Sequence, residues 1–293
     1  MPSADHARLI ALLRARPVAA TATLAERRAA FERIGELFPL AADVRVEATR
    51  LSDLRLEWIT AGSAVPGRVL LYLHGGAYAA GSCNTHRELA SRLARAARAR
   101  LLLPEYRLAP EHPFPAALRD AVAALRLLAA SAREVLLAGD SAGGGLALAT
   151  MLVLRDQGGP LPARCALIAP WVDLAGTAPS LTQLQHHDVL LEPALLARMA
   201  CLYRHGADAR HPLVSPLYGD LRGLPPLCVQ AGSWDLLLDD AVRLHARARS
   251  AGVAVELEVW EQMPHVWHLF AGMLEEGRDA IEGLGRFLRG PAG

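Results

Sequence analysis

The sequence predicts an α/β fold built on a mostly parallel, eight-stranded sheet that is flanked by helices and covered by a helical cap. Three observations support this prediction. Short apolar runs of strand length alternate with segments of helix length over most of the 293 residues, a pattern typical of parallel sheets. The first two runs alternate apolar and polar residues, as half-exposed antiparallel strands do. One long segment, 175–213, breaks the rhythm and indicates an insertion.

The predicted strands are eight short runs that begin near residues 43, 54, 68, 99, 134, 164, 226 and 254. The later runs are mostly continuous apolar stretches, as expected of strands that are buried on both faces. The predicted helices between them span 84–98, 114–132, 143–157 and 236–251.

The cap is predicted to come from two separate parts of the chain. Residues 5–38 have the spacing of amphipathic helix, and Pro39 ends that region. The insertion holds one predicted helix, after Pro193, and no predicted strand. The predicted division is 1–45 for the N-terminal part of the cap, 46–174 for the first part of the core, 175–213 for the cap insertion and 214–293 for the second part of the core.

Composition and charge narrow the class of partner. The 31 basic and 30 acidic residues leave a net charge of +1, which offers no electrostatic footprint for nucleic acid or an anionic membrane. The basic residues are all arginine, so Schiff-base chemistry, a pyridoxal-phosphate lysine and a P-loop lysine are excluded. We expect a small-molecule substrate.

Cysteine usage and the N-terminus bear on cofactors and location. The four cysteines have no metal-type spacing, so we expect reduced thiols and neither a metal nor an organic cofactor. The first residues lack the apolar run of a signal peptide, and no stretch reaches the roughly 18 apolar residues of a membrane span. We therefore expect a cytoplasmic protein.

The strongest chemical signal is GDSAGG at 139–144, which follows an apolar run and begins a predicted helix. It matches G-x-S-x-G, in which the glycines leave room for a strained strand-to-helix turn that exposes the serine hydroxyl. The N–H of Ala142, at the helix start, then points toward an oxyanion formed beside Ser141. This context favours a nucleophile over a flexible Gly/Ser turn.

A serine nucleophile needs a histidine base and an orienting acid. In open α/β sheets the reacting groups lie beyond the carboxyl ends of the strands. Asp235 follows the run near 226 and His265 follows the last run, so both return to that edge. We predict Ser141 as nucleophile, Asp235 as acid and His265 as base.

Other residues remain candidates for these two roles. Asp173 also follows a predicted strand and is the second choice for the acid. Asp239 and Asp240 fit ordinary charges in the first turn of a helix. His268 is the rival base, although the sequence around it favours a helix that has already begun.

A second glycine turn lies upstream, in RVLLYLHGGAYAAGS at 68–82. Acyl transfer needs preorganised N–H donors that are aimed at the developing oxyanion, and a Gly-rich loop after an early strand supplies them. We predict that Gly75, Gly76 and Ala77 form an oxyanion hole with Ala142. A tight turn without a ligand is the alternative, and the pairing with GDSAGG argues against it.

These motifs together resemble the bacterial hormone-sensitive-lipase family of α/β-hydrolases. The resemblance is carried by HGGAY at 74–78, EYRLAPEHPFPAA at 105–117, GDSAGG at 139–144, SWDLLLDD at 233–240 and MPHVWHLF at 263–270. It implies an α/β-hydrolase fold and a carboxylesterase that uses Ser141, Asp235 and His265 under a helical cap, with a preference for short acyl chains.

Two positions depart from the family pattern. Ala77 stands where the family usually has the third glycine of HGGG, and if the site requires a positive φ, alanine costs roughly 1 to 2 kcal/mol there. Glu105 stands where the family commonly has aspartate, at a position that we expect to be structural. Arg107 and Glu111 are expected to form loop-fixing ion pairs.

The expected reaction is two-step ester hydrolysis through an acyl-enzyme. Aromatic residues that neighbour the catalytic segments are candidates for an apolar pocket, with core packing as the alternative: Tyr78, Trp171, Trp234 and Trp267. His186 and His187, in the insertion, fit either a solvated position or a substrate contact.

Other functions fit the same fold. Lactones, acetyl esters and arylformamidase-like amides are alternative substrates for the same three residues. A non-catalytic receptor, such as the plant gibberellin receptors of the wider family, would be expected to lose one of the three. The last predicted strand has an uncovered edge, so a homodimer through that strand is a further hypothesis.

Overall fold

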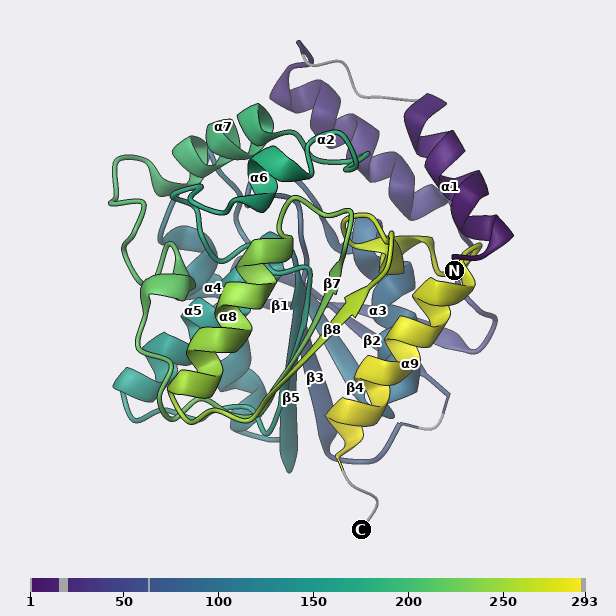
Figure 1. Cartoon of the computed structure of the whole chain (residues 1–293). Coiled ribbons are helices and arrows are strands. Elements are labelled where there is room, and N and C mark those ends of the chain that lie inside the picture. The colour runs from purple at the N-terminus through teal and green to yellow at the C-terminus, as the bar shows by residue number, and fades with distance from the viewer. Residues whose placement is uncertain (1, 16–20, 63, 291–293) are drawn as a thin grey trace.

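The structure is a computed structural model that describes residues 2–15, 21–62 and 64–290. At its centre lies one eight-stranded sheet with the strand order β1-β2-β4-β3-β5-β6-β7-β8 (Figure 1). The strands are β1 Val44–Leu51, β2 Leu54–Ala61, β3 Arg68–Leu73, β4 Arg100–Pro104, β5 Glu134–Asp140, β6 Cys165–Ile168, β7 Leu227–Gly232 and β8 Val255–Trp260. Each predicted run forms one of these strands.

The direction of the strands also follows the prediction. β1 pairs antiparallel with β2, and β2 pairs antiparallel with β4. The six strands β4, β3, β5, β6, β7 and β8, in sheet order, are parallel to one another. The central strands are buried on both faces, which explains their continuous apolar sequences.

Helices cover both faces of the sheet (Figure 1). α3 (Cys83–Ala97) and α9 (Glu275–Arg289) pack on one face. α4 (Ala116–Ala129), α5 (Ala142–Asp156) and α8 (Leu238–Ser250) pack on the other. Four of these five match the predicted helices, and α9 lies beyond the segments for which a helix was predicted.

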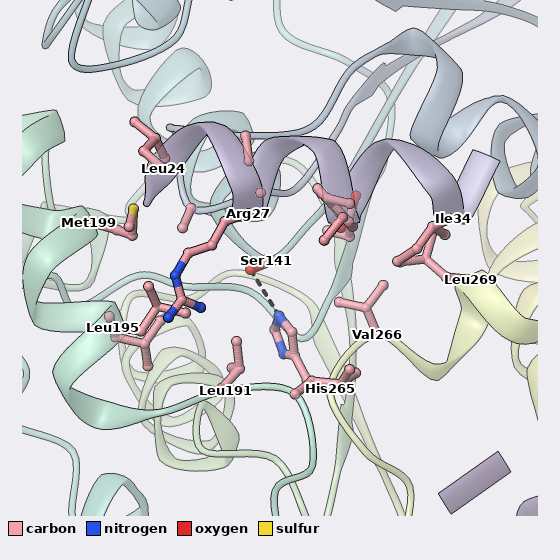
Figure 2. Close-up of a pocket in the computed structure, with 18 of the residues that line it drawn as sticks. Leu24, Arg27, Ile34, Ser141, Leu191, Leu195, Met199, His265, Val266 and Leu269 are labelled. Atoms are coloured by element: carbon pink, nitrogen blue, oxygen red, sulfur yellow. Dashed lines mark hydrogen bonds between the residues drawn. The ribbon is translucent and has the colours of Figure 1, made fainter. Parts of the chain in front are cut away.

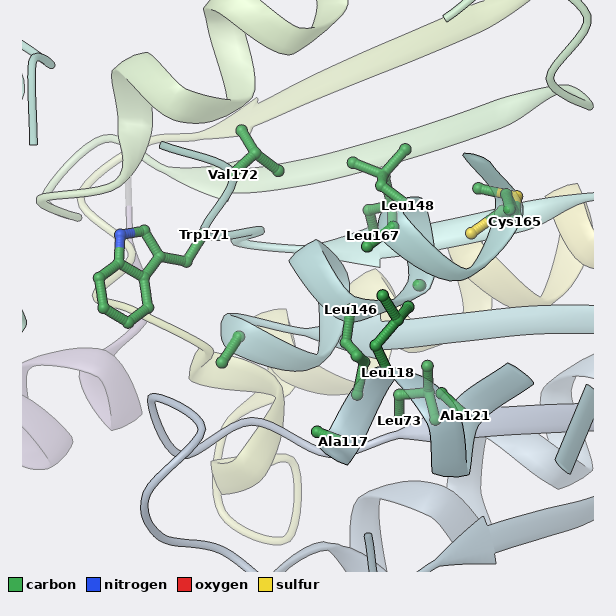
Figure 3. Close-up of a cluster of buried hydrophobic side chains, with 14 of the residues drawn as sticks. Leu73, Ala117, Leu118, Ala121, Leu146, Leu148, Cys165, Leu167, Trp171 and Val172 are labelled. Carbon is green, nitrogen blue, oxygen red and sulfur yellow. The ribbon is translucent and has the colours of Figure 1, made fainter. Parts of the chain in front are cut away.

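The core on the second face is packed mainly with leucine and alanine. Leu73 of β3, Leu118 of α4 and Leu146 of α5 are each at most 4% exposed and belong to one cluster, whose side chains meet between the helices and the sheet (Figure 3). Alanine and glycine on these helices allow them to lie close to the sheet, so the strand ends hold fixed positions.

Helices from two parts of the chain lie above the carboxyl ends of the parallel strands (Figure 1). The N-terminal helices are α1 (Ala4–Ala15), α2 (Leu24–Glu32) and the short 3-10 helix η1 (Arg33–Glu36), and the insertion provides α6 (Ser180–Gln183) and α7 (Pro193–Arg204). Thr23 and Glu26 form a capping box that starts α2, and Pro193 stands in the first turn of α7.

This upper layer differs from the predicted one in two details. Residues 5–38 form separate helices rather than one continuous region, and their residues 16–20 lie outside the described part of the chain. The insertion contains α6 in addition to the predicted helix, because Ser180 anchors this short turn through hydrogen bonds with Leu236 and Asp239. Among the described residues, none of the helices combines the length and apolar character that crossing a membrane requires.

Candidate active site

Ser141 stands on the turn between β5 and α5. Its φ of 51° and ψ of −121° are unusual for a residue with a side chain, and such strain persists only where surrounding packing holds it. The neighbouring glycines make that packing possible. A Cβ on Gly139 would collide with the carbonyl oxygen of Gly143, and a Cβ on Gly143 would collide with that of Leu73.

Asp235 and His265 approach Ser141 from the loops after β7 and β8. Backbone hydrogen bonds join these two loops, since the Ser233 N–H donates to the Trp260 carbonyl at 2.9 Å and the Trp234 N–H donates to the Met263 carbonyl at 3.2 Å. The parallel pairing of β7 with β8 therefore continues beyond the sheet and brings the two side chains together.

The three side chains form one continuous hydrogen-bonded chain. His265 Nδ1 lies 2.9 Å from Asp235 Oδ2, and His265 Nε2 lies 2.9 Å from Ser141 Oγ. With Nδ1 protonated, the imidazole donates to the carboxylate and accepts from the serine hydroxyl. Asp235 is fully buried, and Ser141 and His265 are each 7% exposed. The structure thus brings together all three residues that the sequence predicts as the catalytic set.

Two opposing effects act on the imidazole. Burial lowers the pKa of His265, but the charge and hydrogen bond of Asp235, together with the charges of Asp188 and Asp140, raise that pKa by more, so the net direction is upward from the ordinary histidine value. A raised pKa makes His265 a stronger base and stabilises the imidazolium that forms when it accepts a proton.

The rival base and the rival acid have other partners. His268 Nε2 lies 2.7 Å from Gln230 Oε1 in a fully buried site, and burial lowers the pKa of His268 to about 3. Asp173 forms an ion pair with Arg243 at 2.8 Å and accepts the hydroxyl of Thr177. Neither residue joins the chain of hydrogen bonds at Ser141.

The sequence-based interpretation of Asp240 as an ordinary charge in the first turn of a helix is incomplete. Asp240 does stand in the first turn of α8, but it is buried and accepts hydrogen bonds from the N–H groups of Val172 and Asp173. Burial raises the pKa of Asp240 to about 8. Asp239, its neighbour, instead accepts from the N–H of Ser180. Both carboxyls therefore fasten loops to α8.

The predicted oxyanion loop needs one correction. The N–H of Gly75 donates to Asp140 Oδ1 at 2.9 Å, so it points below the nucleophile and is not directed at a substrate. Gly76 and Ala77 line the cavity that contains Ser141, and Ala142 is the first residue of α5. The alanine at position 77 has a φ of 53°, so it does occupy the left-handed region that favours glycine.

Asp140 supports the turn that carries Ser141. Its carboxylate accepts hydrogen bonds from the Tyr72 hydroxyl at 2.8 Å and from Gly75, and His86 Nε2 lies 3.2 Å away. Burial raises the pKa of Asp140, but its interactions with His86, Tyr72 and His74 together outweigh burial, and the net direction is downward. A buried carboxylate thus ties the loop after β3 to the turn after β5.

The loop after β4 is fixed as expected. Arg107 pairs with Asp120 at 2.7 Å, and Glu111 pairs with Arg28 of α2 at 2.7 Å. Glu105 accepts the N–H of Cys83 at 2.9 Å, at the start of α3. These contacts place all three residues away from the serine, in structural positions.

The predicted aromatic pocket is not what the structure contains. Tyr78 stacks on Tyr203 with ring centroids 3.7 Å apart, and Trp267 is fully buried. Trp171 is 3% exposed and packs near Tyr78, while Trp234 lies beside His6 and His187. None of the four predicted aromatic residues is among the described residues that line the cavity. Their rings fill the protein interior and the loop contacts instead.

The cavity above Ser141 is small and mainly aliphatic. Its volume is about 260 Å³, and it lies between α2, α7 and the loops that carry Ser141 and His265 (Figure 2). Leu24, Ile34, Leu191, Leu195, Met199, Val266 and Leu269 are among its lining residues. Arg27 of α2 also lines it. The N-terminal helix α2 and the helix α7 of the insertion therefore both contribute to the wall around the serine.

Asp188 is a site residue that the sequence analysis missed. One of its carboxylate oxygens accepts the N–H of Leu236, next to Asp235, at 2.9 Å, and the other accepts the N–H groups of Leu190 and Leu191. Burial and the nearby charge of Asp235 raise the pKa of Asp188 to about 6. Its only sequence signal is an aspartate before an apolar run, which is common in turns.

Comparison with known proteins agrees with this geometry. A family described by the alpha/beta hydrolase fold matches residues 70–269. An acetyl-hydrolase from Streptomyces hygroscopicus is 48% identical over 91% of this chain and 90% of its own length. An esterase from the bacterial hormone-sensitive lipase family superposes with a TM-score of 0.95 at 44% identity, covering 99% of this chain and 98% of the other.

A further solved relative is EstE5, whose crystals were soaked with p-nitrophenyl butyrate. It superposes with a TM-score of 0.94 at 42% identity over 98% of both chains. Together with the sheet order, the serine turn and the family match, these relatives show that the chain belongs to the α/β-hydrolase family and, within it, to the bacterial hormone-sensitive-lipase esterases.

Proposed function

We propose that the protein is a serine carboxylesterase that hydrolyses small acyl esters through a covalent acyl-enzyme. The observation that carries this proposal is the continuous chain from Ser141 Oγ through His265 to Asp235, with both hydrogen bonds at 2.9 Å. This is the arrangement in which an imidazole removes a serine proton while a buried carboxylate fixes its tautomer.

In the first step Ser141 Oγ bonds to the acyl carbon and its proton passes to His265 Nε2. The carbonyl electron pair moves onto oxygen, where the N–H groups of Gly76, Ala77 and Ala142 stabilise it. When the tetrahedral intermediate collapses, the bond to the alcohol breaks and the departing oxygen takes the proton from His265. Water then repeats the sequence on the acyl-enzyme and releases the acid.

Asp235 remains ionised throughout this cycle. It holds the proton on Nδ1 so that Nε2 faces the serine, and it stabilises the imidazolium that forms in each step. The raised pKa of His265, with Asp235 as the stabilising partner, fits this role.

The size of the cavity supports small acyl groups as substrates. A volume of about 260 Å³ lies just below the range of roughly 300–1,000 Å³ that is typical of small-molecule sites. The Streptomyces hygroscopicus relative is named an acetyl-hydrolase. After small acyl esters in general, this name favours acetyl esters as the second candidate substrate and acetyl amides as the third. These alternatives use the same three residues.

Replacement of the nucleophile tests the proposal. Ser141→Ala removes the attacking oxygen, so hydrolysis of 4-nitrophenyl acetate and butyrate should fall by about 10⁶-fold in kcat. Ser180→Ala is a suitable control, since the Ser180 hydroxyl lies in α6, donates to the Leu236 carbonyl and accepts the N–H of Asp239, and does not bond to His265. Near-full activity of Ser141→Ala would refute the assignment, and a wild-type protein without any esterase activity would favour a non-catalytic receptor.

We also propose that the segments 1–45 and 175–213 act together as a cap on a core made of 46–174 and 214–293. Leu24 of α2 and Leu195 of α7 face the same cavity, which supports a shared role in enclosing the substrate. Exchange of the 175–213 insertion for that of a relative should change the acyl-chain preference while Ser141 stays reactive toward an activated phosphonate ester.

A homodimer through β8 is the assembly that we propose. β8 is an edge strand of the sheet, and Val259 on it is 47% exposed. An unpaired edge offers its backbone N–H and carbonyl groups to a second copy. Light scattering should report a dimer for the wild type, and Val259→Pro should shift it toward the monomer, since proline removes a ladder N–H. A monomeric wild type would contradict this proposal.

A further inference from the structure

The cavity above Ser141 contains a charged side chain that the hydrolysis of neutral esters does not use. Among the described residues that line it, aliphatic side chains predominate, and Arg27 is the arginine. Figure 2 shows the guanidinium of Arg27 reaching from α2 into the space beside Leu191, Leu195 and Met199. The residue therefore presents its charged end to the place where a substrate would lie.

The neighbouring arginine, Arg28, attaches α2 to the core. Arg28 donates to both carboxylate oxygens of Glu111 at 2.7 Å and to the carbonyls of Ala79 and Ala109. These four bonds fasten α2 to the loops of the core. Arg27, one position earlier on the same helix, lines the cavity above Ser141.

The chemistry of a guanidinium defines the ligand that would gain from it. The group is always charged, and its planar set of N–H donors matches a carboxylate or phosphate-like oxyanion. An apolar wall weakens the competition from water and strengthens such a contact. A neutral acyl chain would gain only contact with the aliphatic stem of the side chain.

The other charged lining residue does not oppose an anion at that wall. Asp140 directs its carboxylate to Tyr72, Gly75 and His86, below the serine turn. Among the described residues that line the cavity, Arg27 is the arginine, and it lies on the α2 side. Because the cavity is only about 260 Å³, an anionic group that reaches Arg27 lies within a few bonds of the scissile ester.

We propose that Arg27 is a specificity-determining residue that selects esters with an anionic group, a carboxylate or a phosphate-like oxyanion, close to the scissile bond. This inference rests on the proposed esterase function and narrows its substrate class. The anionic group can belong to the acyl part or to the alcohol part of the ester, and matched substrate pairs separate the two.

The first measurement compares kcat/KM for two pairs of esters that differ in charge but hardly in shape. The acyl pair is 4-nitrophenyl hemiglutarate and 4-nitrophenyl glutaramate. The alcohol pair is 4-acetoxybenzoate and 4-acetoxybenzamide. After division by the uncatalysed rates, the wild type should favour the carboxylate over the carboxamide in at least one pair, which also identifies the side of the ester that faces Arg27.

Variants of Arg27 then test whether this residue is the cause. Arg27→Met, which keeps most of the stem and removes the charge, should lower the carboxylate-to-carboxamide ratio by about tenfold or more, as expected for a lost charge-assisted hydrogen bond. Arg27→Lys should retain part of the preference. Arg33→Met is the matched control, since Arg33 is exposed and bonds to the Ala29 carbonyl, and its ratio should equal that of the wild type.

The outcomes separate this inference from the proposed function. A wild type that prefers the carboxamide in both pairs would overturn the role of Arg27, and so would an Arg27→Met variant with an unchanged ratio. In both cases hydrolysis of the carboxamides would leave the esterase function standing. If the wild type hydrolysed none of the four esters, or Ser141→Ala hydrolysed them equally fast, the proposed function itself would fail.

Discussion

Ala77 combines a strained backbone conformation with the oxyanion role that we propose for it. Its φ of 53° lies in a region that alanine rarely adopts, yet the role proposed for it needs only its backbone N–H. The side chain is therefore a cost to stability that the chemistry does not require. Tyr78, with a φ of 59°, shares the same turn, so the loop after β3 concentrates backbone strain beside the reacting groups.

Ala77→Gly should stabilise the protein by about 0.5–1 kcal/mol, because relief of left-handed strain exceeds the added entropy of the unfolded chain. Chemical denaturation measures this change. Ala80→Gly, in the same loop without a positive φ, should instead lower stability. Equal losses for both variants would show that position 77 is not strained.

The proposed base makes activity dependent on pH in a definite direction. His265 must be neutral to accept the serine proton, and its pKa is raised above the ordinary histidine value. The kcat/KM for a neutral ester should therefore fall as the pH is lowered through an inflection above about 6.5. Asp235→Asn removes the charge that raises this pKa, so the inflection should move to lower pH.

The same variant should lower kcat by about 10⁴-fold, since asparagine favours the wrong imidazole tautomer. Asp173→Asn is the control, because Asp173 pairs with Arg243 away from the serine. A pH profile that did not shift in Asp235→Asn would argue against an Asp235–His265 pair as the titrating unit.

Between elements, the junction of β3, β5 and α5 depends on close contact that only glycine permits. A Cβ on Gly143 would collide with the carbonyl oxygens of Leu73 and His74. Gly143→Ala should therefore destabilise the protein by about 2 kcal/mol or more and reduce esterase activity, because α5 must move away from the serine turn.

Gly283, a glycine in another helix, provides the comparison for Gly143→Ala. Gly283 of α9 has room for a Cβ at ordinary contact distance, so Gly283→Ala should stabilise the protein by about 0.5–1 kcal/mol through helix propensity alone. Thermal unfolding followed by circular dichroism distinguishes the two. A Gly143→Ala variant as stable as Gly283→Ala would contradict the proposed close packing.

The insertion 175–213 also contacts the loop that carries Asp235, through Asp188. The Asp188 carboxylate accepts the N–H of Leu236. The negative charges of Asp188 and Asp235 both raise the pKa of His265. Asp188→Asn should move the acid limb of the kcat/KM profile to lower pH, with a smaller loss of kcat than Asp235→Asn. Asp239→Asn, a neighbouring carboxyl that binds Ser180, should leave the limb in place.

At the scale of the whole molecule, the features that could be predicted from the sequence are those that depend on local sequence patterns. Continuous apolar runs predicted the buried strands, and glycines in GDSAGG predicted the serine turn. Asp235 and His265 followed from the rule that active residues lie beyond parallel strands. These features need only the order of elements along the chain.

The remaining features depend on distant parts of the chain and could not be predicted in this way. Trp267 and Tyr78 lie next to functional residues in sequence, yet their large rings are buried in the interior. Arg27 and Asp188 lie outside the motifs in sequence, and the N-terminal helices and the insertion bring them to the site by folding over the sheet. No local pattern distinguishes them from surface charges.

The most direct test of the central claim is detection of the acyl-enzyme. Mixed rapidly with excess 4-nitrophenyl acetate, the wild type should gain the mass of one acetyl group, and peptide mapping should place it on Ser141. His265→Ala and Ser141→Ala should not gain it at a comparable rate. Hydrolysis without an acetylated Ser141, even in samples quenched within the first turnover, or acetylation at another residue that tracks turnover, would contradict the account.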